Sequence, residues 1–368
     1  MRSLWWPSLN FGGLVLACSF GCVPATPDVP TGPPAENVTT ERVVDDLELA
    51  IALAFAPDGR IFFTEKGGSL RVIDDGRLVK EPVAEFSVDT LNERGLLGVA
   101  LHPDFAQNDR VYLYYTRRDE AGTTVDNRVV HVTLAGNSAI GDETLIASLP
   151  VGGRFSPIHN GGNIRFGPDD KLYVTIGDVD VSESAQDPDA LSGRILRYND
   201  DGSIPEDNPL GPANPTYALG LRNSFDLAFD PISGTLFATE NSTNAHDEIN
   251  RIVSGGNYGW PEVQGSSESA FQDPLIDLGD SSVVPTGIDF APDARYGTDR
   301  QGKLFYGEFL FGRVHCVELS PDRNEAILRT LFVDGLPSIT DVAFAPDGTL
   351  YILTLNALHR AVLSSTEP

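Results

Sequence analysis

The sequence predicts an all-β protein built as a six-bladed β-propeller. A unit of two apolar strands joined by a Pro-Asp turn recurs along the chain, most clearly at 53–64 and 342–354. Four looser copies of the unit begin at Val99, Ile164, Leu227 and Ile288. A unit this short cannot bury its own apolar faces, so the copies must pack on one another. Copies spaced by tens of residues are typical of a propeller, with one blade for each copy.

Composition favours the same fold class and limits the possible partners. The chain has 368 residues, with 36 Gly and 26 Pro, which suits a loop-rich β protein. Apolar residues make up 41% of the chain, enough for a core. The formal net charge of −27 argues against binding to nucleic acid, because Lys and Arg must neutralise a phosphate backbone. It equally disfavours docking of the protein surface on anionic lipid.

The N-terminal segment, residues 1–22, predicts an export signal. It combines a positive charge at Arg2 with an apolar stretch too short for a stable membrane anchor. The tetrapeptide Val-Leu-Ala-Cys that ends at Cys18 resembles a bacterial lipobox, and Cys22 is a second candidate for lipidation. An ordinary secretory signal is the alternative. Both interpretations export the protein, either to the periplasm or to the outer membrane as a lipid-anchored protein.

The remainder divides into a tether and one folded unit. Residues 23–41 are rich in Pro and Thr and predict a disordered tether. Residues 42–364 predict the propeller, with a strand near 42–49 that pairs with the last blade and leaves no long exposed edge. The six blades are expected at 53–73, 96–134, 162–198, 217–253, 286–319 and 339–363.

The densest candidate for a catalytic site surrounds His159. Two glycines follow His159-Asn160 just before an inner strand, so the backbone there allows close approach of a planar ligand or a sugar. A neutral histidine is the usual base for removing a hydroxyl proton. Asp178 ends the partner strand at the same end of the blade, where a carboxylate could orient the imidazole. The alternatives are a solvent-exposed turn histidine and a turn-capping aspartate.

Two further stretches belong to loops of the fourth blade. The loop that contains Arg222-Asn223 brings a guanidinium that could stabilise a developing oxyanion, the alternative being a surface ion pair. The loop at 240–248 gathers oxygen donors of the kind that Ca²⁺ prefers, although its spacing is not that of an EF-hand. The alternative for that loop is a polar surface segment without a metal.

Taken together, the sequence motifs of this chain resemble those of the soluble glucose/sorbosone dehydrogenase family. The resemblance rests on four ordered signatures, which lie at 95–105, 159–178, 193–209 and 217–261. It spans about Val43 to Leu363, almost all of the predicted folded part. Members of this family are six-bladed propellers that oxidise aldose sugars with pyrroloquinoline quinone (PQQ). The resemblance therefore implies a sugar substrate, a quinone cofactor and an external electron acceptor.

The resemblance implies a role for each candidate residue. His159 matches the general base that takes the anomeric hydroxyl proton while a hydride passes to the quinone and a lactone forms. Asp178 matches the acid that orients this base, and Arg222 matches the cation that stabilises charge on the quinone oxygen. Asn223 and Glu93 match cofactor-binding positions, with Glu93 beside the substrate.

The resemblance also implies a Ca²⁺ ion that holds the quinone, partly through backbone carbonyls. The family usually has Gly-Pro at these carbonyls, where this chain has Ser242-Thr243. Asp247 and Glu248 follow closely and are further candidate ligands.

Three cations that the family directs at the cofactor carboxylates are missing from this chain. Leu310 stands at the lysine position of blade five, and Ser338–Asp341 replaces an Arg-x-Arg-Asp motif in blade six. Each lost charge-assisted hydrogen bond is worth about 1.5–3 kcal/mol. Two functions therefore stay open. One is a PQQ-dependent aldose dehydrogenase with an altered cofactor clamp, and the other is a cofactor-free propeller that binds carbohydrate or protein.

Overall fold

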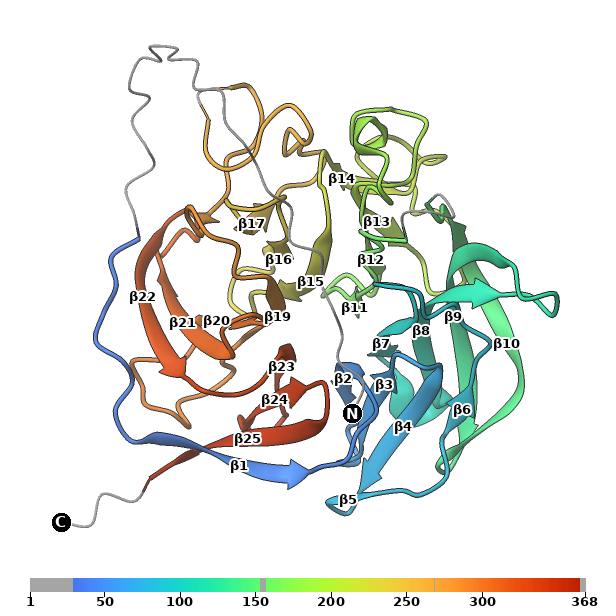
Figure 1. Ribbon diagram of the computed structural model, residues 1–368, viewed down its shortest axis with the longest axis horizontal. Helices are drawn as coiled ribbons and strands as arrows, with labels where there is room; N and C mark the ends of the chain where they lie inside the picture. The colour runs from blue at the N-terminus through green and yellow to red at the C-terminus, as the bar shows by residue number, and fades with distance from the viewer. Residues whose placement is uncertain (1–28, 153–156, 268, 365–368) are drawn as a thin grey trace, which may run out of the picture.

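Six antiparallel sheets form a ring around a central channel (Figure 1). This computed structural model describes residues 29–152, 157–267 and 269–364. Helices among the described residues are single turns, Phe105–Asn108 (α1) and the 3-10 turn Ser182–Ala185 (η1). The predicted all-β, six-bladed propeller is confirmed. The predicted signal at 1–22, with Cys18 and Cys22, lies outside the described residues.

Within each blade the strands follow one another outward from the channel, and the innermost strands contact each other around the ring. The innermost strands are β2 (Ala50–Phe55), β7 (Leu96–Leu101), β11 (Ile164–Phe166), β15 (Ser224–Phe229), β19 (Pro285–Phe290) and β23 (Ile339–Phe344). The second strands are β3 (Ile61–Glu65), β8 (Arg110–Arg118), β12 (Leu172–Ile176), β16 (Leu236–Glu240), β20 (Leu304–Glu308) and β24 (Leu350–Thr354).

The outer half of each blade completes a sheet of four or five strands. The third strands are β4 (Ser69–Asp74), β9 (Thr124–Ala135), β13 (Arg194–Tyr198), β17 (Glu248–Ile252), β21 (Arg313–Leu319) and β25 (Ala357–Leu363). The outermost strands are β5 (Arg77–Leu78) with β6 (Ala84–Glu85), β10 (Ser138–Leu149), β14 (Thr216–Leu219), β18 (Ile276–Asp277), β22 (Ala326–Val333) and β1 (Val38–Val44).

The first strand of the chain closes the ring. β1 pairs antiparallel with β25, with Val38 opposite Leu363, so blade six combines the N-terminal strand with the last three strands. The predicted closure therefore has the right partner, but the strand begins at Val38 rather than near Arg42. The tether predicted at 23–41 is also too long, because Gly32 already donates a backbone hydrogen bond to the outer strand of blade five at Arg329.

Several predicted blade boundaries are wrong: the blades expected at 96–134 and 286–319 also include the outermost strands β10 and β22, which end at Leu149 and Val333. β14, at Thr216–Leu219, pairs with β13 and is the outer strand of blade three, whereas the sequence placed Tyr217 at the start of blade four. The recurring sequence unit covers only the buried inner strands. Outer strands face solvent on one side and lack that apolar signature, so the pattern does not reveal them.

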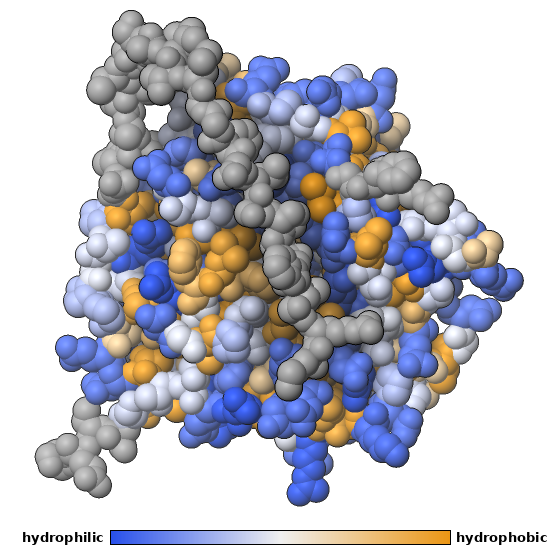
Figure 2. Space-filling view, in the orientation of Figure 1, coloured by the Kyte–Doolittle hydropathy of each residue, from blue (hydrophilic) through white to orange (hydrophobic). Residues whose placement is uncertain are grey.

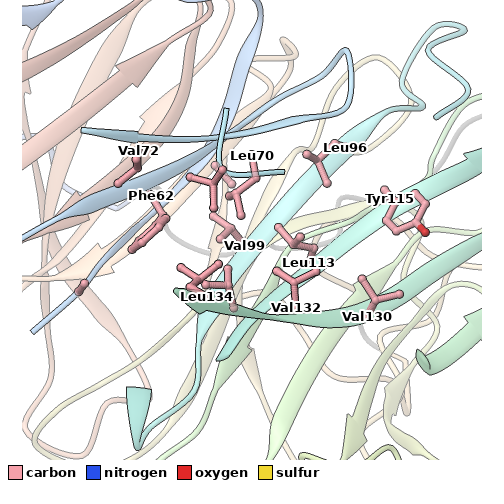
Figure 3. Packing of buried hydrophobic residues seen from close by; sticks show 14 of the residues in the cluster. Phe62, Leu70, Val72, Leu96, Val99, Leu113, Tyr115, Val130, Val132 and Leu134 are labelled. Carbon is pink, nitrogen blue, oxygen red and sulfur yellow. The ribbon is translucent and has the colours of Figure 1, made fainter. Parts of the chain in front are cut away.

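The core lies between neighbouring blades. Figure 3 shows Phe62 and Leu70 of blade one packed against Val99, Leu113 and Val130 of blade two, all of them buried. Each blade thus buries its apolar faces on its neighbours, as the repeat predicted. On the outside, Figure 2 shows hydrophilic side chains around the rim of one face and apolar ones gathered nearer its middle.

Three aspartates on the innermost strands tie neighbouring blades together at the channel. Their carboxylates accept backbone N–H bonds at 2.8–2.9 Å in the pairs Asp226 with Ile288, Asp289 with Phe344, and Asp341 with Leu53. The Arg165 guanidinium reaches Asp289 from blade three at 3.3 Å. Burial raises the pKa of Asp226 to about 6 and the pKa of Asp341 well above its usual range.

We predict that Asp226→Asn removes part of the pH dependence of stability. The pKa of Asp226 is raised from 3.8 to about 6 in the fold, so the folded state binds more protons between these values. Stability should therefore fall as pH rises through this window, by up to about 1.4 kcal/mol for each pH unit. Urea unfolding between about pH 4 and 7 measures this slope. Equal slopes in the variant and the wild type would contradict the prediction.

Candidate active site

One end of the channel opens into a cavity of about 420 Å³. Its walls include four of the residues singled out from the sequence, namely Glu93, His159, Arg222 and Asn223. Ser242 and Thr243 also line it, together with apolar side chains such as Leu97 and Phe225. The loops before blades two, three and four thus bring together residues that are far apart in the sequence. A mostly apolar cavity with a few convergent polar groups is the usual form of a small-molecule site.

His159 and Asp178 form a buried pair at the wall of this cavity. His159 Nδ1 lies 2.7 Å from Asp178 Oδ1, and the two side chains are 9% and 2% exposed. The other carboxylate oxygen of Asp178 accepts a hydrogen bond from Trp260 Nε1 at 2.9 Å. With both oxygens held, Asp178 fixes the plane of the imidazole. The sequence analysis missed Trp260 in this role, because the indole comes from the loop after blade four's third strand.

Arg222 defines the protonation of His159. Its Nη2 lies 2.7 Å from His159 Nε2, and a guanidinium can only donate. Nε2 must therefore present its lone pair, which leaves the proton on Nδ1, where it is donated to Asp178. Arg222 Nη1 donates to the carbonyls of Asn241 and Ser242 at 2.7 and 2.8 Å, and its guanidinium lies 5.5 Å from the Trp260 ring. The two contacts thus select the tautomer that has its proton on Nδ1 and the lone pair of Nε2 on the side of Arg222.

Backbone contacts hold this group in place. Glu93 Oε2 accepts a hydrogen bond from the His159 N–H at 2.6 Å, and Asn223 Oδ1 accepts one from the Gly161 N–H at 3.0 Å. His159 itself has a left-handed backbone, with φ of 55°. A non-glycine residue in that conformation is uncommon and needs such surrounding support. Glu93 therefore positions the His159 backbone as well as lining the cavity.

Glu240 is a positioning residue that the sequence analysis missed. It is the last residue of β16, is buried, and accepts hydrogen bonds from the N–H groups of Arg222 and Asn223 and from the Ser224 hydroxyl. Burial raises its pKa to about 8. A repeated pattern could have revealed it, because β3 and β20 also end in glutamates, Glu65 and Glu308.

The carboxylates predicted to bind calcium have other partners. Asp247 accepts hydrogen bonds from the Ser242, Val283 and Val284 N–H groups and the Ser282 hydroxyl. Glu248 accepts them from the Gly265 N–H and the Asn250 amide. Within the described residues, no group of three or more His, Cys, Asp or Glu side chains is arranged to hold a metal. Asp247 and Glu248 therefore do not fit as calcium ligands and instead fold the loop.

The predicted calcium site also included the backbone carbonyls of Ser242 and Thr243 in the same loop. The Ser242 carbonyl accepts a hydrogen bond from Arg222 rather than facing the cavity unpaired. The Thr243 hydroxyl and N–H both donate to the Gln264 side chain. Calcium binding at Ser242 and Thr243 stays a prediction, and no chemical step below depends on it.

No Lys or Arg stands at the positions of blades five and six where the family resemblance implied one. Leu310 is 56% exposed and does not line the cavity, whereas its neighbour Phe309 does. Thr340 lines the cavity from blade six. A lysine not considered in the sequence analysis, Lys66 of blade one, lies in the same wall.

The sequence of this chain matches a known protein family. A family model described as Glucose / Sorbosone dehydrogenase matches residues 47–361, almost the whole propeller. The chain belongs to the glucose/sorbosone dehydrogenase family. Within the described residues, no helix has the length and apolar character needed to cross a membrane.

Two similar relatives and one similar solved structure carry sugar dehydrogenase names. Aldose sugar dehydrogenase YliI of Escherichia coli is 32% identical over 346 residues, covering 86% of this chain and 90% of the relative. Quinoprotein glucose dehydrogenase B of Acinetobacter calcoaceticus is 35% identical over 290 residues, covering 70% of this chain and 59% of the relative. The structure of the PQQ-bound aldose sugar dehydrogenase of Streptomyces coelicolor has a TM-score of 0.77 and 28% identity, covering 89% of this chain and 99% of that one.

The cavity fits a planar quinone of this kind. Asn241 Oδ1 is buried without a hydrogen-bond partner, and the Asn241 side chain lines the cavity, so its wall offers a polar atom to a ligand. Arg222 and Asn223 supply donors beside it, and Leu97 and Phe225 supply apolar contacts for flat rings. Arg222 and Asn223 would hold the quinone oxygens of PQQ, which only accept hydrogen bonds, and Asn241 Oδ1 would accept from an N–H of the ligand.

We predict that Gly177→Ala destabilises the site. A Cβ at Gly177 would lie 2.2 Å from the His159 carbonyl oxygen and 2.8 Å from Asn223 Oδ1. Overpacking of this kind typically costs about 1–3 kcal/mol. Gly67→Ala is the matched control, since a Cβ there meets nothing within 4 Å. Equilibrium unfolding in urea should show a loss for Gly177→Ala and a change within about 0.5 kcal/mol for the control. Equal losses of stability in the two variants would contradict the close packing around Gly177.

Proposed function

We propose that this protein is an exported, PQQ-dependent dehydrogenase that oxidises the anomeric hydroxyl of an aldose to a lactone. The observation that carries the proposal is the arrangement of Asp178, His159 and Arg222 on the wall of a cavity of about 420 Å³. The names of the relatives, a quinoprotein glucose dehydrogenase and aldose sugar dehydrogenases, support the same reaction class.

His159 acts as the general base. Its Nδ1 proton is donated to Asp178, so Nε2 is the ring nitrogen that accepts the proton of the anomeric hydroxyl. The imidazolium formed in this step is stabilised by the Asp178 carboxylate. Trp260 holds the other oxygen of that carboxylate, so the pair stays aligned as charge develops. Bound PQQ supplies the acceptor for the hydride that leaves the anomeric carbon.

The Arg222 guanidinium must move away from His159 Nε2 before this nitrogen can accept a proton from the substrate. The single lone pair of Nε2 is occupied by Arg222 at 2.7 Å, so the substrate hydroxyl has to replace this contact. Nη1 stays anchored on the carbonyls of Asn241 and Ser242, which keeps the guanidinium beside the cavity. The released donor can then face the oxygen on which negative charge accumulates.

Export forms part of this proposal and rests on the sequence of residues 1–22. A lipid on Cys18 or Cys22 would hold the enzyme at the outer membrane, and a cleaved secretory signal would leave it in the periplasm. In both cases the sugar and the electron acceptor are met outside the cytoplasm.

A cofactor-free propeller that binds carbohydrate or protein is the second candidate. The observation that favours it is the uncharged surface at Leu310 and Thr340, where the family has cations. Adding PQQ to the purified protein, with and without Ca²⁺, separates the two candidates. The enzyme should bind PQQ at micromolar concentrations and reduce a dye with at least one aldose. A protein that binds no quinone would support the second candidate.

We predict that His159→Ala lowers PQQ-dependent dye reduction by at least about 100-fold, because general-base catalysis is lost. The circular dichroism spectrum should not change. His102→Ala is the control, since His102 Nε2 also lies 3.4 Å from a carboxylate, Asp200, but does not line the cavity. Retained turnover in His159→Ala, or an equal loss in His102→Ala, would remove His159 as the base.

A further inference from the structure

Lys66 is placed at the cavity by a fixed backbone. It follows the last residue of β3, its N–H donates to the Leu49 carbonyl at 2.9 Å, and its own carbonyl accepts from the Leu96 N–H at 3.2 Å. The root of the side chain is therefore held between blades one and two. Lys66 lines the cavity, as do Ile51 of blade one and Leu355 of blade six.

Few charges face this cavity. The ionisable side chains in its wall are Lys66, Glu93, His159 and Arg222. Arg222 is engaged with His159 and two carbonyls, and Glu93 holds the His159 backbone. The Lys66 ammonium donates to the Thr90 carbonyl at 2.6 Å and has no ion-pair partner among the described residues. Lys66 is thus the cation of this wall that remains available to a ligand.

The surroundings of Lys66 favour an anionic ligand. Partial burial lowers the pKa of Lys66, because an ammonium is poorly solvated there, and this outweighs the opposite effect of the Asp89 carboxylate. A carboxylate brought to this position would replace the lost solvation and form a charge-assisted hydrogen bond. Arg313 of blade five, three residues after Leu310, lies 3.4 Å from Asp334 and over the Phe311 ring, and it does not line the cavity.

The position of Lys66 relative to Arg222 matches a long, flat ligand. In a ring of six blades, blade one lies across the channel from blade four. Arg222 enters from the loop before β15 of blade four, and Lys66 follows β3 of blade one. A planar molecule between them would have one end at Arg222 and His159 and the other at Lys66. PQQ carries its quinone oxygens and its carboxylates on different parts of one flat ring system.

We propose that Lys66 binds a carboxylate of PQQ and takes over the anchoring that blades five and six do not provide. This inference rests on the proposed function. It assigns the cofactor two cationic contacts from opposite blades, Arg222 at the quinone and Lys66 at the carboxylates. A carboxylate can approach an ammonium from several directions, so Lys66 does not need the planar bidentate geometry that an arginine uses.

The test is the equilibrium affinity for PQQ, measured by quenching of tryptophan fluorescence in the purified, cofactor-free protein. Lys66→Met should raise the dissociation constant about 10- to 100-fold, the loss of one charge-assisted hydrogen bond. Lys66→Arg should restore most of the affinity. Lys80→Met is the matched control, because it removes the same charge from blade one at a side chain that is 94% exposed. It should bind PQQ as the wild type does.

A second ligand tests whether Lys66 contacts a carboxylate of PQQ. PQQ trimethyl ester lacks the carboxylates, so the wild type and Lys66→Met should bind it with equal affinity. A loss of affinity for the ester in Lys66→Met would mean that the substitution acts through the shape of the cavity, and would overturn the inference. Equal binding of PQQ itself by the wild type and Lys66→Met would also overturn it, while leaving the proposed function intact. Failure of the wild type to bind PQQ would instead refute the proposed function.

Discussion

The pairing of β1 with β25 is the constraint on which the rest of the structure depends. It joins Val38 near one end of the described chain to Leu363 near the other, and so closes a ring of six sheets. Closure fixes the radius of the channel and the distances between loops of different blades. The candidate site needs this, since its walls come from at least five of the six blades. An open ring would leave the same residues in place along the chain but not opposite one another.

Within the closed ring, one line of hydrogen bonds carries the chemistry. It runs from the Trp260 indole through Asp178 and His159 to Arg222, and ends on the carbonyl of Asn241. A carboxylate on one side of the imidazole and a guanidinium on the other allow one tautomer only. Glu240, with its pKa raised to about 8 by burial, orients the segment that carries Arg222 without touching the cavity.

Membership of a family does not transfer every role to the matching residue. Asp247 and Glu248 stand where calcium ligands were expected, yet their oxygens hold the backbone of their own loop. The cations expected from blades five and six are absent, while Lys66 of blade one faces the same cavity. Charge around the cavity is therefore arranged differently from the family pattern, although the His159–Asp178 pair is present.

The sequence by itself determined the six-bladed propeller, because each copy of its short apolar unit must find a neighbour to bury its faces. It also singled out His159, Asp178, Arg222 and Asn223 as chemical candidates. Only the tertiary structure decided that β14 belongs to blade three, that Trp260 holds Asp178, and that Lys66 faces the cavity. The physical reason is that a local pattern records which faces are apolar, whereas contacts across a ring depend on loop paths and on closure.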